Sequence, residues 1–251
     1  MGASSGIGRE IARLLIGDGW TVGVAARRLD RLEELRAQAP ERVVARSIDV
    51  TCAQADEQLL EFVRDLGGMD LYVHVSGIGR RNPTLAADIE LGTVRTNAEG
   101  FCRMVGCAYR YMAERCQEPA ASASGGQVPA PPYRRQIAAV SSIAGTMGMG
   151  AAPSYSATKA MQNAYLEALA QQARMRRLDI ALTDIRPGFV DTDLLSGDPY
   201  PLLMPVDKVA KQALRAIYRR EAVRIIDGRW RTVTTLWRLI PHWLWRRLRI
   251  G

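Results

Sequence analysis

Hydrophobic positions along the chain alternate between short runs typical of buried strands and stretches with apolar residues at helical spacing. Leu29, Leu32 and Leu35 illustrate the helical spacing. The expected strands cover 20–26, 42–48, 70–76, 137–142 and 179–187, and the expected helices cover 10–15, 29–39, 55–66, 86–115 and 154–177. Repeated strand–helix units of this length predict an α/β fold, a doubly wound parallel sheet with helices on both faces.

One domain accounts for most of the 251 residues. We expect it to span 1–222 and to be followed by an extension, 223–251. The segment 117–133, rich in Pro, Gly, Ala and Ser, is predicted to be a flexible loop inserted between the long helix and the next strand.

The net charge of +8 is concentrated at one end of the chain. Residues 219–251 hold nine arginines and two acids, so they carry +7 and the other 218 residues carry +1. No base-stacking platform accompanies these arginines, which argues against a nucleic-acid partner. The sequence shows no signal peptide and no apolar run of membrane-spanning length, and its four cysteines and two histidines suggest no metal site. We therefore expect a cytoplasmic protein.

A glycine-rich stretch, GASSGIG, occupies residues 2–8 directly before the first helix. Glycines allow a tight turn and close approach to a pyrophosphate, and the amides at a helix start attract its negative charge. Close helix packing is the alternative explanation for such a loop. The candidate phosphate-binding residues are Gly2, Ser4, Ser5, Gly6, Ile7 and Gly8.

A second candidate site combines a tyrosine, a lysine and a serine. Tyr155 and Lys159 in YSATK are four residues apart, so they share one face of a helix. A nearby ammonium lowers the pKa of a phenol, which makes Tyr155 a candidate proton donor and acceptor. The strand ending in AVSS, 13 residues upstream, brings the Ser142 hydroxyl within reach.

Taken together, these segments resemble the short-chain dehydrogenase/reductase family, from Gly2 to about Ala222. GASSGIG is similar to its cofactor loop, Asp49-Val50 to its adenine-contacting pair, RTNAEG to its helix asparagine segment and YSATK to its catalytic pair. RPGFVDT (186–192) is similar to the loop that holds the nicotinamide end, with Pro187, Gly188, Val190 and Thr192 as candidate contacts. The fold implied is Rossmann-like.

The resemblance implies hydride transfer between a nicotinamide and a carbonyl or alcohol carbon. Tyr155 would exchange the proton, Ser142 would orient the substrate oxygen, and Lys159 would bind the nicotinamide ribose. Asn97 would hold a water in a proton relay. Ser141 points the other way along the strand and is interpreted as structural. The resemblance also implies a homo-oligomer.

The end of the second expected strand bears on cofactor choice. An NAD-binding chain places an acidic residue there for the ribose 2′-hydroxyl, but this chain has Ala26 followed by Arg27 and Arg28. Cations suit a 2′-phosphate, so NADP(H) is favoured over NAD(H). Solvated surface arginines are the alternative.

Two segments depart from the family pattern. HVSG (74–77) replaces Asn-Asn-Ala-Gly, which leaves Gly77 to approach the adenosine ribose and makes His74 a hydrogen-bonded core residue in our interpretation. The glycine loop also begins at residue 2, without the central strand that normally precedes it. The missing strand would leave its neighbours facing each other across a gap with unpaired backbone groups. Our hypothesis is that Met1 is an internal residue of a longer chain.

Two segments allow more than one interpretation: the C-terminal extension and an expected substrate lid that precedes it. Trp230, Val233, Trp237, Ile240, Leu244 and Leu248 are predicted to form one apolar face, in two helices divided by Pro241. With arginines elsewhere, residues 229–251 suit either packing on protein or peripheral contact with a membrane. The expected lid, 191–206, is apolar at Leu194, Leu195, Leu202, Leu203 and Met204, which suggests a hydrophobic substrate.

The sequence thus predicts an NADP(H)-dependent oxidoreductase acting on a hydrophobic carbonyl or alcohol. The alternatives are a non-catalytic cofactor-binding scaffold of the same fold and a peripheral membrane protein.

Overall fold

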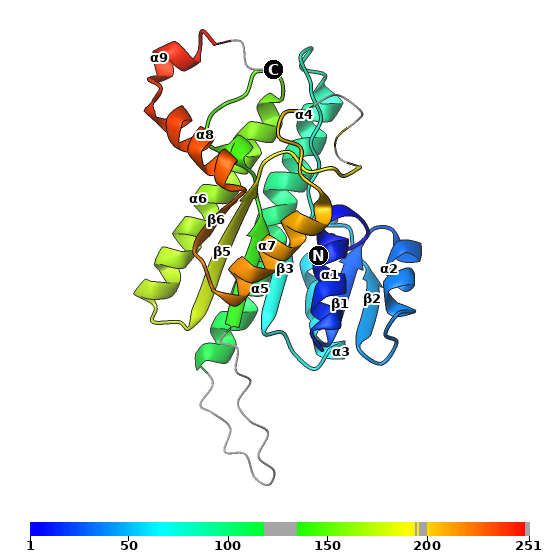
Figure 1. The fold of residues 1–251 in the computed structure, drawn as a ribbon. Coiled ribbons are helices and arrows are strands. Elements are labelled where there is room, and N and C mark those ends of the chain that lie inside the picture. Colours follow the sequence, from blue (N-terminus) through cyan, green and yellow to red (C-terminus); the bar gives the residue numbers. More distant parts are fainter. Residues whose placement is uncertain (118–134, 194, 196–199, 249–251) are drawn as a thin grey trace.

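The computed structural model describes residues 1–117, 135–193, 195 and 200–248, and shows parallel strands between two layers of helices (Figure 1). The strands are β1 (Val22–Ala26), β2 (Val43–Ser47), β3 (Leu71–His74), β4 (Arg135–Val140), β5 (Ile180–Pro187) and β6 (Val223–Ile226). They form a two-stranded sheet, β1-β2, and a four-stranded sheet, β3-β4-β5-β6, and every pairing is parallel. The predicted α/β, Rossmann-like fold is confirmed.

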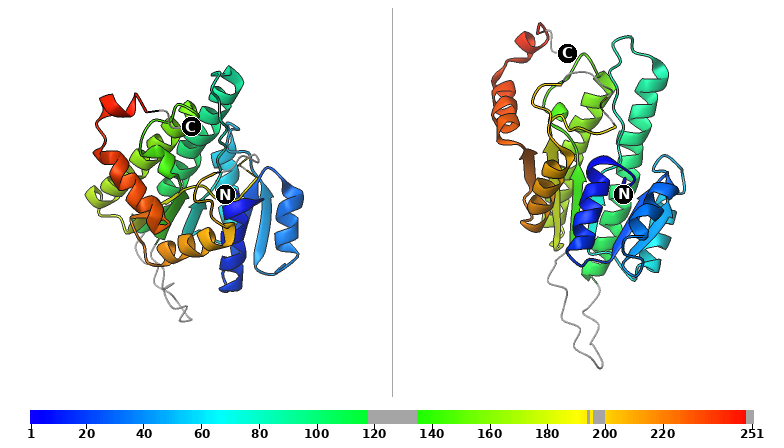
Figure 2. Two further views of the ribbon diagram at one scale, coloured as in Figure 1. Left: turned by 45° about the horizontal axis from the view of Figure 1, so that its top comes forward. Right: turned by 45° about the vertical axis from the view of Figure 1, so that its right-hand side comes forward.

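Helices cover both faces of these sheets, as the two turned views show (Figure 2). One face packs against α1 (Gly6–Gly17), α2 (Leu29–Arg36) and α7 (Val206–Tyr218), and the other against α3 (Ala55–Asp65), α5 (Phe101–Gln117) and α6 (Pro153–Met175). Strand residues alternate between the two cores. In β4, Ala138 and Val140 join the α1–α7 cluster, whereas Ile137 and Ala139 join the α5–α6 cluster. This alternation explains why β4 is apolar at each position from Ile137 to Val140.

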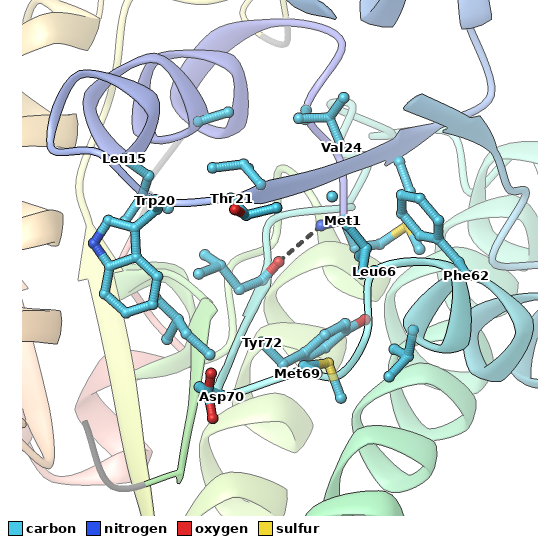
Figure 3. Close-up of a pocket in the computed structure, with 18 of the residues that line it drawn as sticks. Met1, Leu15, Trp20, Thr21, Val24, Phe62, Leu66, Met69, Asp70 and Tyr72 are labelled. Atoms are coloured by element: carbon cyan, nitrogen blue, oxygen red, sulfur yellow. Dashed lines mark hydrogen bonds between the residues drawn. The ribbon is translucent and has the colours of Figure 1, made fainter. Parts of the chain in front are cut away.

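The predicted gap in the sheet lies between β1 and β3. Met1 and Gly2 together join the two edges. The Met1 ammonium donates to the Val73 carbonyl at 2.9 Å, the Met1 carbonyl accepts from Val75 N at 2.9 Å, and Gly2 N donates to the Ala25 carbonyl at 2.7 Å. Below Met1 lies a cavity of about 250 Å³ lined by both strands, α1 and α3 (Figure 3). Met1 and Gly2 therefore bridge the two strands at one end, and the cavity separates them further along.

The element predictions hold with two corrections. The long helix expected over 86–115 is divided into α4 (Ala87–Val94), a π-helical turn (Arg95–Gly100) and α5. At this turn Gly100 approaches Val50 so closely that a Cβ would lie 2.9 Å from the Val50 carbonyl oxygen. The structure also adds α7 and β6, in a region to which the sequence analysis assigned no element.

The expected extension, 223–251, begins with β6, which pairs with β5 in the larger sheet. It then forms two helices, α8 (Gly228–Leu239) and α9 (His242–Trp245), divided at Pro241 as predicted. The prediction of one continuous apolar face is wrong. Trp230 is buried and Val233 and Trp237 pack on the α7 core, but Leu244 and Leu248 are exposed beyond Pro241 because the chain changes direction there. The predicted loop at 117–133 lies, from residue 118, outside the described residues, as does Leu194. No helix in the described segments is long and apolar enough to cross a membrane.

Candidate functional site

The predicted catalytic side chains meet where the strands of the larger sheet end. Ser142 directly follows β4, Tyr155 and Lys159 lie in the first two turns of α6, and Asn97 lies in the π-helical turn. Pro153 at the start of α6 suits the first turn, where no amide needs a helical partner. Ser142, Lys159 and Asn97 are buried and Tyr155 is partly exposed.

Ser142 and Tyr155 are directly connected. Their side chains share a hydrogen bond, and the Ser142 hydroxyl also accepts a bond from Ala144 N at 3.0 Å. Ser141 points to the other side, where its hydroxyl donates to the Asp184 carboxylate, which in turn is paired with Arg186 at 2.7 Å. The structural interpretation of Ser141 agrees with this buried polar cluster.

The ammonium of Lys159 is hydrogen-bonded to groups other than the Tyr155 hydroxyl. Its ammonium donates to the Val140 carbonyl at 3.2 Å and to Gln162 Oε1 at 3.0 Å, and it lies 5.7 Å from the centre of the Tyr155 ring. Burial lowers the pKa of Lys159 to about 8, and the charge of Asp184 partly opposes this shift. The lysine therefore titrates close to physiological pH.

The expectation that Lys159 lowers the pKa of Tyr155 is not met in this arrangement. Burial raises the pKa of Tyr155 above its usual value, and the hydrogen bond with Ser142 only partly offsets this effect. The physical reason is the orientation of Lys159, whose ammonium is engaged by Val140 and Gln162. Tyr155 is thus a protonated phenol at neutral pH.

Asn97 is fixed by three side-chain bonds and one main-chain bond. Its Oδ1 accepts from Ile78 N at 2.9 Å, and its Nδ2 donates to the Ile78 carbonyl at 2.7 Å and to Thr158 Oγ1 at 3.3 Å. Its carbonyl accepts from Gln162 Nε2 at 2.8 Å. Gln162 therefore joins Lys159 to Asn97, at the place where the resemblance implies a water.

The glycine loop packs too closely to admit larger residues. Gly2 has φ +86°, and a Cβ there would lie 2.6 Å from Ser76 N; a Cβ on Gly8 would lie 2.2 Å from the Gly2 carbonyl oxygen. Helix α1 begins at Gly6 with no acidic residue in its first turn and no side-chain bond from its N-cap, Ser5. The amides of Gly6, Ile7 and Gly8 therefore lie at a helix start that suits an anion.

The two arginines after β1 take different positions. Arg28 Nη2 donates to Ser4 Oγ at 3.2 Å and to Ser5 Oγ at 2.8 Å, which places its charge on the glycine loop. Arg27 is exposed, and its charge acts on Asp49. Partial desolvation raises the pKa of Asp49, but hydrogen bonds from Thr51 and the charge of Arg27 outweigh it and leave that pKa lowered. Val50 is buried beside Gly100.

Glycines after β3 border the catalytic side chains. A Cβ on Gly77 would lie 3.3 Å from Asn97 Oδ1 and 3.6 Å from Lys159 Nζ, and a Cβ on Gly79 would lie 2.6 Å from the Tyr155 ring. His74 is buried against Phe101, and its Nδ1 lies 3.0 Å from the Tyr72 hydroxyl. Burial lowers the pKa of His74 to about 3, so the ring is neutral, as expected of a core histidine. The described residues contain no cluster of potential metal ligands.

The loop after β5 closes the site from the other side. Thr192 faces the glycine loop, since a Cβ on Gly6 would lie 3.1 Å from its methyl group. Val190 is bridged to Met204, and Asp191 N donates to the Met204 carbonyl at 2.9 Å. Gly188, next to Pro187 at the end of β5, packs so tightly on Trp230 that a Cβ would lie 2.2 Å from the indole nitrogen. Helix α8 thus supports the loop that borders the site.

Sequence reasoning missed Gln162, Gly79 and Trp230. Gln162 is seven residues after Tyr155 and three after Lys159, so helical spacing alone would have placed it on the same face. Gly79 is separated from Gly77 by one residue, and nothing else in the sequence around it indicated a contact with Tyr155. The contact between Trp230 and Gly188 depends on tertiary packing, for which the sequence offers no marker.

The fold and the arrangement of this site are those of a nucleotide-binding oxidoreductase. Comparison with known proteins identifies the family. The family model for short chain dehydrogenases matches residues 1–199, so the chain belongs to the short-chain dehydrogenase family. An uncharacterized oxidoreductase of Myxococcus xanthus is 30% identical over 260 residues, covering 99% of this chain and 95% of that protein. The protein is therefore an oxidoreductase of this family.

Two further comparisons give a relative of known name and a solved structure of the same fold. A farnesol dehydrogenase of Aedes aegypti is 30% identical over 204 residues, covering 77% of each protein. The crystal structure of a short-chain dehydrogenase from Streptomyces avermitilis is similar with a TM-score of 0.76 and 23% identity, covering 93% of this chain and 89% of that one. This second likeness shows the fold alone.

Proposed function

We propose that the protein is an NADP(H)-dependent oxidoreductase that interconverts a hydrophobic carbonyl compound and its alcohol. The observation that carries the proposal is the cluster of Ser142, Tyr155 and Lys159 beside the glycine loop. A scaffold that only bound the cofactor would not need this cluster.

NADP(H) is proposed over NAD(H) because of the groups at the end of β1. Ala26 offers no carboxylate to a ribose 2′-hydroxyl, and Arg28 lies on the Ser4 and Ser5 hydroxyls at the edge of the glycine loop. A 2′-phosphate at this edge would accept charge-assisted hydrogen bonds from Arg28, and Arg27 would add its charge nearby.

The residues of the chain would handle the proton. When bound, the dinucleotide supplies or accepts the hydride at its nicotinamide ring. Tyr155 would donate its proton to the substrate oxygen during reduction, for which a protonated phenol is the form required. Ser142 would hold that oxygen by a hydrogen bond, and Lys159, charged below its pKa of about 8, would bind the nicotinamide ribose.

A hydrophobic substrate is supported by residues of the segment after β5. Phe189 packs on Tyr200 with ring centres 4.6 Å apart and on Trp230 at 5.6 Å. Leu202 and Leu203, from the expected lid, are exposed beside Met204, which is buried. The similarity to a farnesol dehydrogenase points in the same direction.

We also propose that the protein is a cytoplasmic homo-oligomer. Leu91 and Val94 are exposed one turn apart on α4, and a second copy would cover this apolar strip. Light scattering after gel filtration tests this part of the proposal.

The main test is oxidation of NADPH and of NADH with a panel of hydrophobic aldehydes and ketones, comparing the natural chain with Tyr155→Phe. We expect turnover with NADPH that Tyr155→Phe abolishes, while nicotinamide fluorescence shows that the variant still binds the cofactor. Equal turnover by the variant, or cofactor binding without turnover of any compound, would contradict the proposal.

A further inference from the structure

The C-terminal helices α8 and α9 present an exposed surface of leucine, tryptophan and arginine, here called the tail surface. Leu236, Leu239 and Trp243 are 56%, 74% and 61% exposed. The exposed arginines of the tail surface are Arg231, Arg238, Arg246 and Arg247. Leu236 and Leu239 lie one turn apart on α8, so they share one side of that helix.

The opposite side of these helices is anchored to the domain. Trp230, Trp237 and Trp245 form a chain of edge-to-face ring contacts with centres 6.3 and 5.5 Å apart. Trp230 and Trp245 are buried, and Trp245 Nε1 donates to the Gly148 carbonyl at 2.7 Å. The helices are therefore held in place, and the exposed leucines and Trp243 are not required for that anchoring.

The charge of the tail surface has one sign. Residues 228–251 contain six arginines and no acidic residue. Arg229 is paired with Asp227 at 2.6 Å, but Arg231, Arg238 and Arg246 form no ion pair within the described part of the chain. Arg247 lies over the Trp243 ring at 5.5 Å. An occupant of this surface must therefore be both apolar and negatively charged.

We propose that the tail surface docks on an anionic lipid bilayer, with Leu236, Leu239 and Trp243 in the headgroup–acyl boundary and the arginines on lipid phosphates. Tryptophan suits this boundary because one end of its ring is apolar and the other polar. Each arginine held near an anionic surface adds roughly fivefold to binding, and apolar burial adds to it.

A second copy of the chain fits this surface less well. In a symmetric dimer the same patch would meet itself, which would bring the arginines of both copies together. Residues 228–251 contain no acidic side chain to separate them. A bilayer supplies the missing negative charge.

Docking would bring the substrate end of the fold to the lipid. The same helices contact the loop after Ser142 through Gly148 and the loop after β5 through Gly188. A hydrophobic substrate dissolved in the membrane would then have a short path to the site. Only this consequence rests on the proposed function; lipid binding itself requires no catalysis.

The test is sedimentation of the full chain with phosphatidylcholine vesicles, with and without phosphatidylserine. We expect binding that requires phosphatidylserine and weakens with salt. The double variant Arg238→Gln/Arg246→Gln should lower the partition coefficient on the order of 30-fold. Its matched control, Arg64→Gln/Arg174→Gln, removes the same charge from elsewhere on the surface and should bind as the natural chain does.

The apolar contribution is tested by Leu239→Ser/Trp243→Ser, which should weaken binding by roughly tenfold or more. Met175→Ser is the control, since Met175 is 77% exposed at the far end of α6. Circular dichroism and thermal unfolding check that each variant is folded. Absence of binding to anionic vesicles at low salt would overturn the proposal, as would tail variants that alter only the oligomeric state. Vesicle binding without turnover would contradict the proposed function alone.

Discussion

The side-chain amide of Gln162 connects Lys159 to the main chain of Asn97. Its Oε1 accepts from the lysine ammonium at 3.0 Å, and its Nε2 donates to the Asn97 carbonyl at 2.8 Å. All three residues are buried, so the amide has no solvent to compete with these bonds. Gln162 therefore acts on the site by positioning Lys159.

Replacement of this amide should change the pH dependence of turnover. Gln162→Leu removes an acceptor from the buried ammonium, so the pKa of Lys159 should fall below about 8. Turnover at pH 8 should then drop about tenfold, and its high-pH limb should move to lower pH. Gln162→Glu keeps the acceptor and adds negative charge, so the same limb should move to higher pH. The measurement is kcat against pH.

The control for this prediction is Gln171→Leu, an exposed position on the same helix. It should leave the profile unchanged. A profile that is the same in the natural chain and both Gln162 variants would show that Gln162 only fills space.

Arg28 should determine the preference for NADPH. Arg28→Ala removes the guanidinium that lies on Ser4 and Ser5, and a lost charge-assisted hydrogen bond typically weakens binding by about 10- to 100-fold. The dissociation constant of NADPH should rise by that factor, while that of NADH should change little. Arg31→Ala, on the exposed side of α2, is the matched control. Equal weakening of both cofactors would mean that Arg28 supports the loop and does not select the phosphate.

Local spacing accounts for the parts of the site that the sequence predicted. Tyr155 and Lys159 were placed together because residues four apart share a helix face, and Ser142 because it ends a strand beside that helix. Gly2, Gly6 and Gly8 were recognised because a tight turn before a helix needs them.

The parts that were missed depend partly on contacts between distant segments and partly on local patterns that were overlooked. The orientation of Lys159 follows from Val140, which is distant in sequence, and from Gln162, which shares a helix face with it. Strand β6 is four residues long and mostly unburied, so its sequence lacks a clear strand pattern. Helix α7 was missed although Val209, Ala213 and Ile217 recur at helical spacing, since the preceding segment was interpreted as a lid.

Gly79 should be essential for placing Tyr155. In Gly79→Ala the added Cβ would lie 2.6 Å from two carbons of the Tyr155 ring, so the ring must shift from its position beside Ser142. We expect kcat to fall by about tenfold or more with little change in cofactor affinity. Gly92→Ala is the control, because nothing lies within 4 Å of its Cβ and the change should favour α4 by about 0.5–1 kcal/mol. Full activity of Gly79→Ala would show that Tyr155 adapts without cost.

In a chain that begins at Met1, the buried amino group of that residue should make stability depend on pH. Burial lowers the pKa of this amino group from its ordinary value of 8.0 to about 5, so between pH 5 and 8 the unfolded chain binds more protons than the folded one. The free energy of unfolding should therefore rise with pH across that window. His74, with a pKa lowered by burial to about 3, adds a rise of the same sign below about pH 6.5. Urea unfolding at a series of pH values measures the contributions of the Met1 amino group and of His74.

Extending the chain at Met1 with an apolar, β-branched segment should raise stability and reduce this dependence. The added residues would continue from Met1 into the cavity of about 250 Å³, pair with β1 and β3, and replace the buried ammonium with a peptide group. Each buried valine or isoleucine contributes about 1.5–3 kcal/mol, so we expect a gain of at least a few kcal/mol. The rise between pH 6.5 and 8 should disappear, and the part due to His74 should remain.

A glycine–serine extension of the same length separates the two effects. It also removes the buried ammonium, but it brings no apolar side chains to the cavity and costs more conformational entropy to order. It should flatten the pH dependence without raising stability at pH 8. The amino group of Met1 is already neutral at pH 8, since its pKa is about 5. If both extensions stabilised the chain equally at pH 8, backbone pairing would therefore explain the effect, and filling of the cavity would contribute nothing.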